Sequence, residues 1–202
     1  MTNFRPKLLS LAVVALGCST SSSSDDSRDA RRDTQVLAAG DTPTLASAAA
    51  SPKPVQALVG SYRHAGGQAE QDALEAAVEA VVQEMNVLTR DIARKRLLAA
   101  NKIPDSLVIS TSEHHVTIQF DDRKYTGTID GPAVDAVGIT GDALRMTLRM
   151  REGQLVQHFV GDKGKRTNSM RRKAETVVMH VVVESESLPK SLVYDLTFAA
   201  KG

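Results

Sequence analysis

A change in hydrophobic periodicity at Pro104 constrains the fold more than any other feature of this sequence. Beyond Pro104, apolar residues tend to recur at every second position in eight short segments, a pattern typical of strands with one buried face. The segments are SLVIS, HVTIQFD, KYTGTID, ALRMTLRMR, GQLVQHFV, KRTNSMRRK, TVVMHVVVES and LVYDLTFAA. Short turns separate them, and short turns join antiparallel neighbours. Because an open meander leaves two unpaired edges, the pattern favours closure into a barrel.

The segment before Pro104 predicts one short strand and two helices. GSYRHAGG, starting at Gly60, reads as a strand followed by a turn. Apolar residues then recur at helical spacing, which predicts an amphipathic helix over about 68–85. The apolar stripe consists of Leu74, Ala77, Val78, Val81, Val82, Met85 and Leu88. Thr89 can cap a second helix over about 90–100, which Asn101 and Pro104 end.

This order of elements resembles the calycins and, within them, the fatty-acid-binding proteins. Three stretches carry the resemblance: GSY at 60–62, DSLVISTSEHHVTIQF at 105–120 and REGQLVQHFVGDKGKRTNSMRRK at 151–173. The resemblance implies a mainly β fold, an antiparallel calycin-like β-barrel of about 8–10 strands with a two-helix insert after the first short strand. It also implies an interior that takes a fatty acid or another small amphipathic ligand.

The same resemblance implies two ligand-binding residues. In that family two arginines and a tyrosine hold a fatty-acid carboxylate, and the last strand ends in Arg-x-Tyr. Here that position reads LVY, so Leu192 replaces one arginine and Tyr194 is kept. The spacing from the Gly-containing turn maps the second arginine to Arg171. We therefore expect Arg171 and Tyr194 to face the interior and to contact the polar end of a ligand; in the alternative, Arg171 points outward and Arg172 or Lys173 takes the other face.

The N-terminus predicts export and lipid attachment. Arg5 and Lys7 precede an apolar run, Leu8 to Leu16, that is too short to cross a hydrocarbon core of about 30 Å. Cys18 is the single cysteine of the chain, and VALGCS resembles the lipobox of bacterial lipoproteins. The resemblance implies a signal peptide over 1–17 and a membrane anchor of acyl chains such as palmitate on Cys18. An ordinary signal peptide with an incidental cysteine is the alternative.

The sequence divides after the signal peptide into a linker, 18–57, and a barrel domain, 58–202. The linker is rich in Ser, Asp, Ala and Pro and contains no aromatic residue, a composition typical of disorder. Ser19 follows the cysteine where an aspartate often signals inner-membrane retention in lipoproteins. The resemblance therefore implies a lipid-anchored protein of the cell envelope, with the periplasmic face of the outer membrane or the cell surface favoured.

No catalytic or metal-binding motif stands out in the domain. The sequence lacks Gly-x-Ser-x-Gly, a phosphate loop and a dinucleotide fingerprint, and its 5 histidines show no metal-ligand spacing. We therefore expect no enzyme activity, no metal and no cofactor. A net charge of +1 does not argue for a nucleic-acid partner. The basic residues between Arg145 and Lys173 fit either a surface for anionic lipids or an acidic partner, or a solvated barrel wall.

Two roles compete most closely at this point, and an enzyme on the same scaffold is a third. The first is non-catalytic binding of a small apolar or amphipathic molecule, with methionines such as Met146 and Met179 as an adaptable lining. The second is a protein-interaction module of the cell envelope, an inhibitor or assembly factor, with a filled barrel. A cavity of roughly 300–1,000 Å³ fits the first role, whereas a filled core fits the second.

Overall fold

The structure is a computed structural model that describes residues 53–201. The helices are α1 (Lys53–Gln56), α2 (Gly67–Val82) and α3 (Arg90–Ala100). The strands are β1 (Gly60–His64), β2 (Ser106–Ser112), β3 (His115–Phe120), β4 (Arg123–Thr128), β5 (Val134–Val137), β6 (Ala143–Arg151), β7 (Gln154–Gly161), β8 (Gly164–Lys173), β9 (Thr176–Glu184) and β10 (Leu192–Ala200). The predicted signal peptide, the candidate lipidation site Cys18 and the linker up to residue 52 lie outside the described residues.

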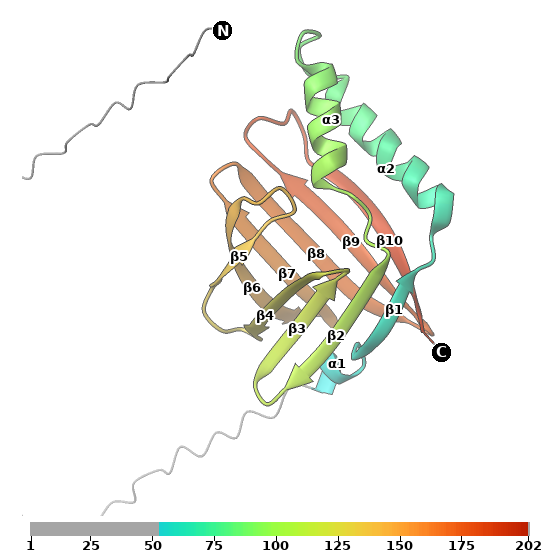
Figure 1. Ribbon diagram of the computed structural model, residues 1–202, viewed down its shortest axis with the longest axis vertical. Helices are drawn as coiled ribbons and strands as arrows, with labels where there is room; N and C mark the ends of the chain where they lie inside the picture. Colours follow the sequence, from blue (N-terminus) through green and yellow to red (C-terminus); the bar gives the residue numbers. More distant parts are fainter. Residues whose placement is uncertain (1–52, 202) are drawn as a thin grey trace, which may run out of the picture. The chain divides into compact units, whose positions relative to one another are not determined.

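The ten strands form one antiparallel sheet in the order β4-β3-β2-β1-β10-β9-β8-β7-β6-β5. The first and last strands are neighbours in this order, and the sheet curls into a nearly closed barrel (Figure 1). The predicted mainly β barrel with two helices after the first strand is thereby confirmed. β5 was not among the predicted strands, because its four residues are too few to show a period of two.

The two ends of the sheet, β4 and β5, are not paired by a ladder. The barrel is joined there by a bridge between Ile129 and Leu148, and the amide of Asp130 donates to the Leu148 carbonyl at 2.8 Å. Gly127 permits the approach of β4 to β6, since a Cβ at this position would lie 3.1 Å from the terminal methyl of Met146. The seam is therefore held by side-chain packing and a few backbone contacts.

The end of the barrel next to α1, which we call the lower half, is filled with side chains. Its buried residues include Ile109, Val116, Leu148, Leu155, Met170, Val177, Leu196 and Phe198. Val55 in α1 and Leu58 are also buried in this core, and Arg172 on β8 donates to the carbonyl of Ala57 at 3.1 Å. Residues of α1 therefore pack on the barrel, although the sequence analysis predicted that the domain starts at residue 58.

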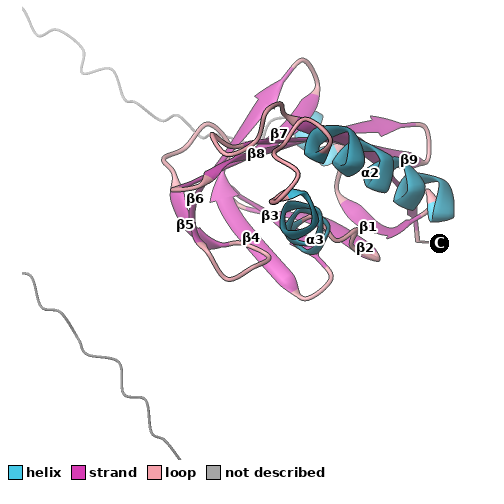
Figure 2. Cartoon of the chain, turned by 90° about the horizontal axis from the view of Figure 1, so that it is seen from above, coloured by secondary structure: helices cyan, strands magenta, loops and turns pink. Residues whose placement is uncertain are grey.

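The opposite end of the barrel, which we call the mouth, lies beneath the α2–α3 hairpin. The predicted stripe is confirmed for Leu74, Val78, Val81 and Val82, which are buried, whereas Leu88 lies beyond the end of α2 and is 87% exposed. The helix packs against β10 and α3. Arg94 on α3 donates to both carboxylate oxygens of Glu79 on α2, at 2.7 and 3.1 Å, which fixes the two helices together. Seen from above, α3 is nearly end-on over the mouth (Figure 2). No helix in residues 53–201 is long and apolar enough to cross a membrane.

Candidate functional site

A cavity of about 220 Å³ opens at the mouth of the barrel. Its walls come from the end of α3, from β3, β4, β7, β8 and β9, and from the β5–β6 and β7–β8 connections. The apolar lining includes Phe120, Tyr125, Leu144, Phe159, Met179 and Val183. The barrel is thus hollow near the mouth and filled in its lower half. The ligand-binding role predicted a hollow barrel and the interaction role a filled one, so each prediction fits one half.

Arg166 is the centre of a polar network on one wall of this cavity. Its Nε donates to Asn168 Oδ1 at 2.9 Å, and its two terminal nitrogens donate to Asn101 Oδ1 at 3.0 Å and to the Tyr194 hydroxyl at 3.2 Å. The Tyr194 hydroxyl in turn donates to Asn101 Oδ1 at 3.2 Å. Residues from α3, β8 and β10 are therefore joined through one guanidinium group.

The neutral members of this network are deeply buried and well satisfied. Asn101, Asn168 and Gln157 are 1%, 2% and 0% exposed. The Asn168 amide donates to Gln157 Oε1 at 3.0 Å, and the Asn101 amide donates to the Leu97 carbonyl at 2.8 Å. Because buried amides are costly unless they are hydrogen-bonded, this arrangement holds the side chains around Arg166 in fixed positions.

The guanidinium of Arg166 has no acidic partner among the described residues. Its hydrogen bonds all go to neutral oxygens, and no carboxylate in residues 53–201 lies within ion-pair distance of it. Burial raises the pKa of the nearby Tyr194 hydroxyl, while the positive charge of Arg166 opposes that rise. Tyr194 therefore stays neutral at physiological pH, and the wall presents an uncompensated positive charge to the cavity.

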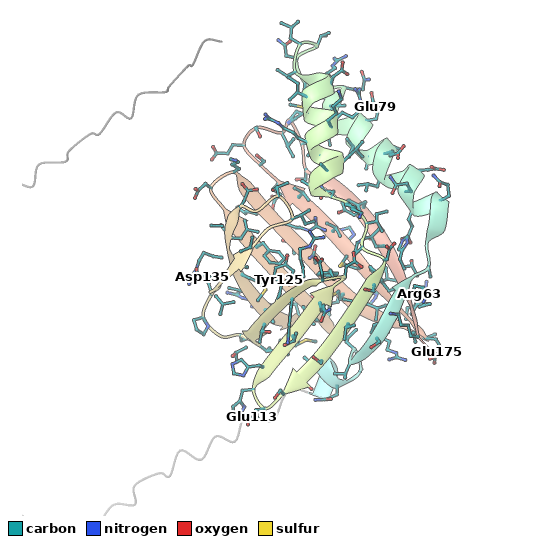
Figure 3. The ribbon with its side chains drawn as sticks, viewed as in Figure 1. Arg63, Glu79, Glu113, Tyr125, Asp135 and Glu175 are labelled. Carbon is teal, nitrogen blue, oxygen red and sulfur yellow. The ribbon has the colours of Figure 1, made fainter. Side chains whose placement is uncertain are left out.

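Three aromatic rings form an apolar wall of the same cavity. Tyr125 meets Phe159 edge to face, with ring centroids 5.1 Å apart, and meets Phe120 in the same manner at 6.4 Å. The Tyr125 hydroxyl donates to the Val137 carbonyl at 3.1 Å, across the unpaired ends of the sheet. Figure 3 shows Tyr125 within the barrel and Asp135 at its outer edge. Burial raises the pKa of Tyr125, so this side chain is also neutral at physiological pH.

The rim of the cavity carries more positive than negative charge. The basic lining residues are Lys102, Arg123, Lys163, Lys165 and Arg166, and the acidic ones are Asp142 and Glu184. Lys163 lies 3.6 Å from Asp142, and a hydrogen bond from Thr140 together with this lysine lowers the pKa of Asp142. One basic side chain is thereby compensated, and the rim as a whole favours anions.

Of the two predicted ligand-binding residues, only Tyr194 faces the interior of the barrel. Tyr194 faces the interior and is 6% exposed, so its predicted orientation is confirmed. The prediction that Arg171 faces the interior is wrong: Asn168 and Met170 point inward on β8, and alternation turns the exposed Arg171 outward. Whether Tyr194 contacts a ligand stays a prediction.

The sequence analysis missed Arg166, Asn101 and Asn168. A signal for Arg166 was present, since it shares the parity of the apolar Met170 on β8, whereas Arg171 does not. No comparable signal existed for Asn101, which was interpreted only as a residue that ends a helix. Its contact with Arg166 joins positions 65 residues apart in the sequence.

Three histidines of the described residues, His64, His158 and His180, form ion pairs or hydrogen bonds outside the cavity. His64 pairs with Glu70 at 2.9 Å, and His180 pairs with Asp195 at 2.7 Å. Strand β8 lies between β7, which carries His158, and β9, which carries His180, so the two histidines are not cross-strand neighbours. His158 instead hydrogen-bonds Thr167 on β8. No group of three or more histidine, cysteine or acidic residues within 53–201 is placed to hold a metal ion.

Several solved structures are similar to this chain. The REP1-NXSQ fatty acid transporter has a TM-score of 0.48 and 14% identity, covering 73% of this chain and 98% of that chain. Lipid binding protein 8 of Caenorhabditis elegans, in its apo form, has a TM-score of 0.48 and 9% identity, covering 72% of this chain and 96% of that one. The fatty acid binding protein of Schistosoma mansoni in complex with arachidonic acid has a TM-score of 0.47 and 12% identity, covering 74% and 99%. No protein-family model and no curated protein matches the chain.

Proposed function

We propose that the barrel domain is a non-catalytic binding protein for a small amphipathic anion. The apolar part of the ligand occupies the cavity at the mouth, and the anionic group binds the guanidinium of Arg166 beside the Tyr194 hydroxyl. The observation that carries this proposal is the interior-facing arginine with no acidic partner among the described residues, set against an apolar cavity wall.

A half-buried cation with only neutral partners is an expensive feature for a protein to keep. Withdrawal of a charge from water costs free energy that neutral hydrogen bonds repay only in part. An arginine has five N–H donors, and the hydrogen bonds within the domain use three of them. The remaining donors can hold a carboxylate, sulfonate or phosphate through charge-assisted hydrogen bonds.

The protein-interaction module is supported less well by these observations. That role predicted a filled barrel, whereas only the lower half is filled and the mouth has a cavity of about 220 Å³, smaller than the roughly 300–1,000 Å³ expected for the binding role. A protein whose working surface is the outer wall of the barrel also has no need for a cation facing the cavity, since neutral side chains could fill that space.

Export and lipid attachment belong to the same proposal. We propose that acylated Cys18 tethers the domain to a membrane of the cell envelope, so that the barrel binds its ligand close to that surface. The lipobox-like sequence VALGCS motivates this part of the proposal. Membrane attachment through Cys18 does not depend on the cavity.

The binding proposal is tested with two arginines of the same strand. Arg166→Ala and Arg171→Ala each remove one positive charge from β8, but only Arg166 faces the cavity. The fluorescent anion anilinonaphthalene sulfonate is titrated into the wild type and both variants. We expect Arg166→Ala to weaken binding about tenfold or more, because a hydrogen bond to a charged group is lost. We expect Arg171→Ala to leave the affinity unchanged. Equal affinities for the two variants would show that the cavity arginine does not bind the anion.

A further inference from the structure

We infer that the site selects compact anions with an aromatic apolar part and that it holds them with the charged group at the mouth. Long-chain fatty acids are excluded because the lower half of the barrel is filled. This inference rests on the function proposed above and adds the size, the chemistry and the orientation of the ligand.

The size limit follows from where the barrel is hollow. The cavity measures about 220 Å³, below the roughly 300–1,000 Å³ of sites for drug-sized ligands. It cannot extend downward without moving core side chains, since Leu155, Met170 and Leu196 are each 0% exposed. Close-packed cores do not yield such space cheaply. A long alkyl chain therefore finds no room beneath the mouth.

The orientation follows from the position of Arg166 along its strand. β8 begins at Gly164 at the mouth, so Arg166 lies near the rim, and Asn168 and Met170 lie progressively deeper. Tyr194 is likewise near the start of β10, and Asn101 follows the end of α3. The positive charge is thus at the top of the cavity, and the anionic group of a ligand must be there too.

The groove next to the cavity is lined by more polar than apolar side chains. It measures about 800 Å³ and lies between the β7–β8 turn and the β9–β10 connection. Polar and charged side chains line most of it, including Asp162, Lys163, Glu186, Ser187 and Lys190. This groove can receive the polar end of a ligand but offers little to a hydrocarbon chain.

The aromatic preference follows from the wall next to the charge. Phe159 on β7 is the direct cross-strand partner of Arg166 on β8. Phe159, Tyr125 and Phe120 meet edge to face, so the wall presents ring edges and faces close to the guanidinium. Aromatic rings gain from offset or edge-to-face contacts beyond the area they bury. A flat aryl carboxylate or sulfonate can contact Phe159 while its anion reaches Arg166.

Titrations with three carboxylates test the size limit and the aromatic preference separately. Calorimetric titrations of the wild-type protein use naphthoate, octanoate and palmitate, each below the concentration at which it aggregates. We expect naphthoate to bind about threefold to tenfold more tightly than octanoate, the ratio that aromatic contacts supply, and palmitate to bind most weakly. In Phe159→Leu, we expect the advantage of naphthoate over octanoate to disappear.

The outcomes separate this inference from the proposed function. If palmitate binds most tightly and Arg166→Ala weakens it, the site binds anions but the size limit is wrong. If octanoate matches or exceeds naphthoate in the wild type, the aromatic preference is wrong, whether or not Phe159→Leu folds. If none of the three carboxylates binds, the proposed function fails and this inference fails with it.

Discussion

A single strand, β8, places one arginine inside the barrel and three basic residues at its outer, lower end. Arg166 lies under the mouth with Asn168 and Met170 on its face, whereas Arg171, Arg172 and Lys173 are exposed. Parity along the strand separates Arg166 from Arg171, because successive side chains of a strand point to opposite faces. Arg172 shares the parity of Arg166 but lies at the lower end of β8, where it donates to the Ala57 carbonyl and the Tyr62 hydroxyl. Parity and position along the strand together decide which arginine can meet a ligand.

Asn101 should contribute measurably to stability as well as to the site. Its Oδ1 accepts hydrogen bonds from Arg166 and Tyr194, and its amide donates to Leu97. Asn101→Ala leaves buried polar groups without partners, so we expect a loss of about 1–3 kcal/mol in the free energy of unfolding, measured by urea denaturation. Lys102→Ala, at the exposed neighbouring position, is the control and should change it by less than about 0.5 kcal/mol. A similar small change for Asn101→Ala would show that the network adds no stability.

At the scale of elements, α2 is attached to the barrel by its apolar stripe. Val81 is 1% exposed, and burial of such a side chain contributes about 1.5–3 kcal/mol. We therefore expect Val81→Ala to lower the thermal midpoint by several degrees, and Glu75→Ala, on the exposed face of α2, to leave it nearly unchanged. Calorimetry of both variants checks this prediction. Equal midpoints would mean that the stripe does not anchor the helix.

The link between α2 and α3 should weaken in acid. Hydrogen bonds from Arg94, and a further one from the Gln83 amide, lower the pKa of Glu79. A carboxyl whose pKa is lowered by folding stabilises the protein above its unfolded pKa, about 4.3 for Glu, and this contribution is lost as the pH falls through the lower, folded pKa. In Arg94→Met we expect the pKa of Glu79 to rise toward its ordinary value, measured by NMR titration of the side-chain carboxyl. An identical pKa in the wild type would contradict the pairing.

Most elements could be predicted from sequence because their periodicity is local. The ranges of α3, β6 and β10 match the predicted segments. β6 and β10 alternate without a break, and α3 ends before Asn101 as predicted, but the Thr89 side chain does not cap the helix, since its hydroxyl donates to the Asn86 carbonyl. β5 could not be predicted, since four residues between Gly and Pro turns show no period. The spacing from the turn pointed to Arg171. The buried Met170 beside it indicates instead that Arg171 lies on the outer face, because neighbouring side chains of a strand point to opposite faces. The cavity and the burial of Asn101 depend on contacts between distant segments, which no local pattern contains.

At the scale of the whole molecule, the proposed function combines a tether with a binding domain. The lipobox-like sequence lies outside residues 53–201, and Cys18 is the single cysteine of the chain. We expect Cys18→Ser to move the protein from the membrane fraction to the soluble fraction, because two or more acyl chains are needed for stable anchoring and the serine variant would have none. Fractionation and the intact mass of the wild type check this. A wild type without added acyl mass, or a variant that stays with the membrane, would contradict the tether.

We propose that an anion binds Arg166 inside the mouth of the barrel. The most direct measurement is NMR of the arginine side chains, in which each Nε–H gives its own signal, assigned through Arg166→Ala and Arg171→Ala. On titration with naphthoate, we expect the Nε–H signal of Arg166 to shift and saturate, while that of Arg171 stays in place. A saturating shift at Arg171 alone, or binding that leaves the Arg166 signal unmoved, would contradict the claim.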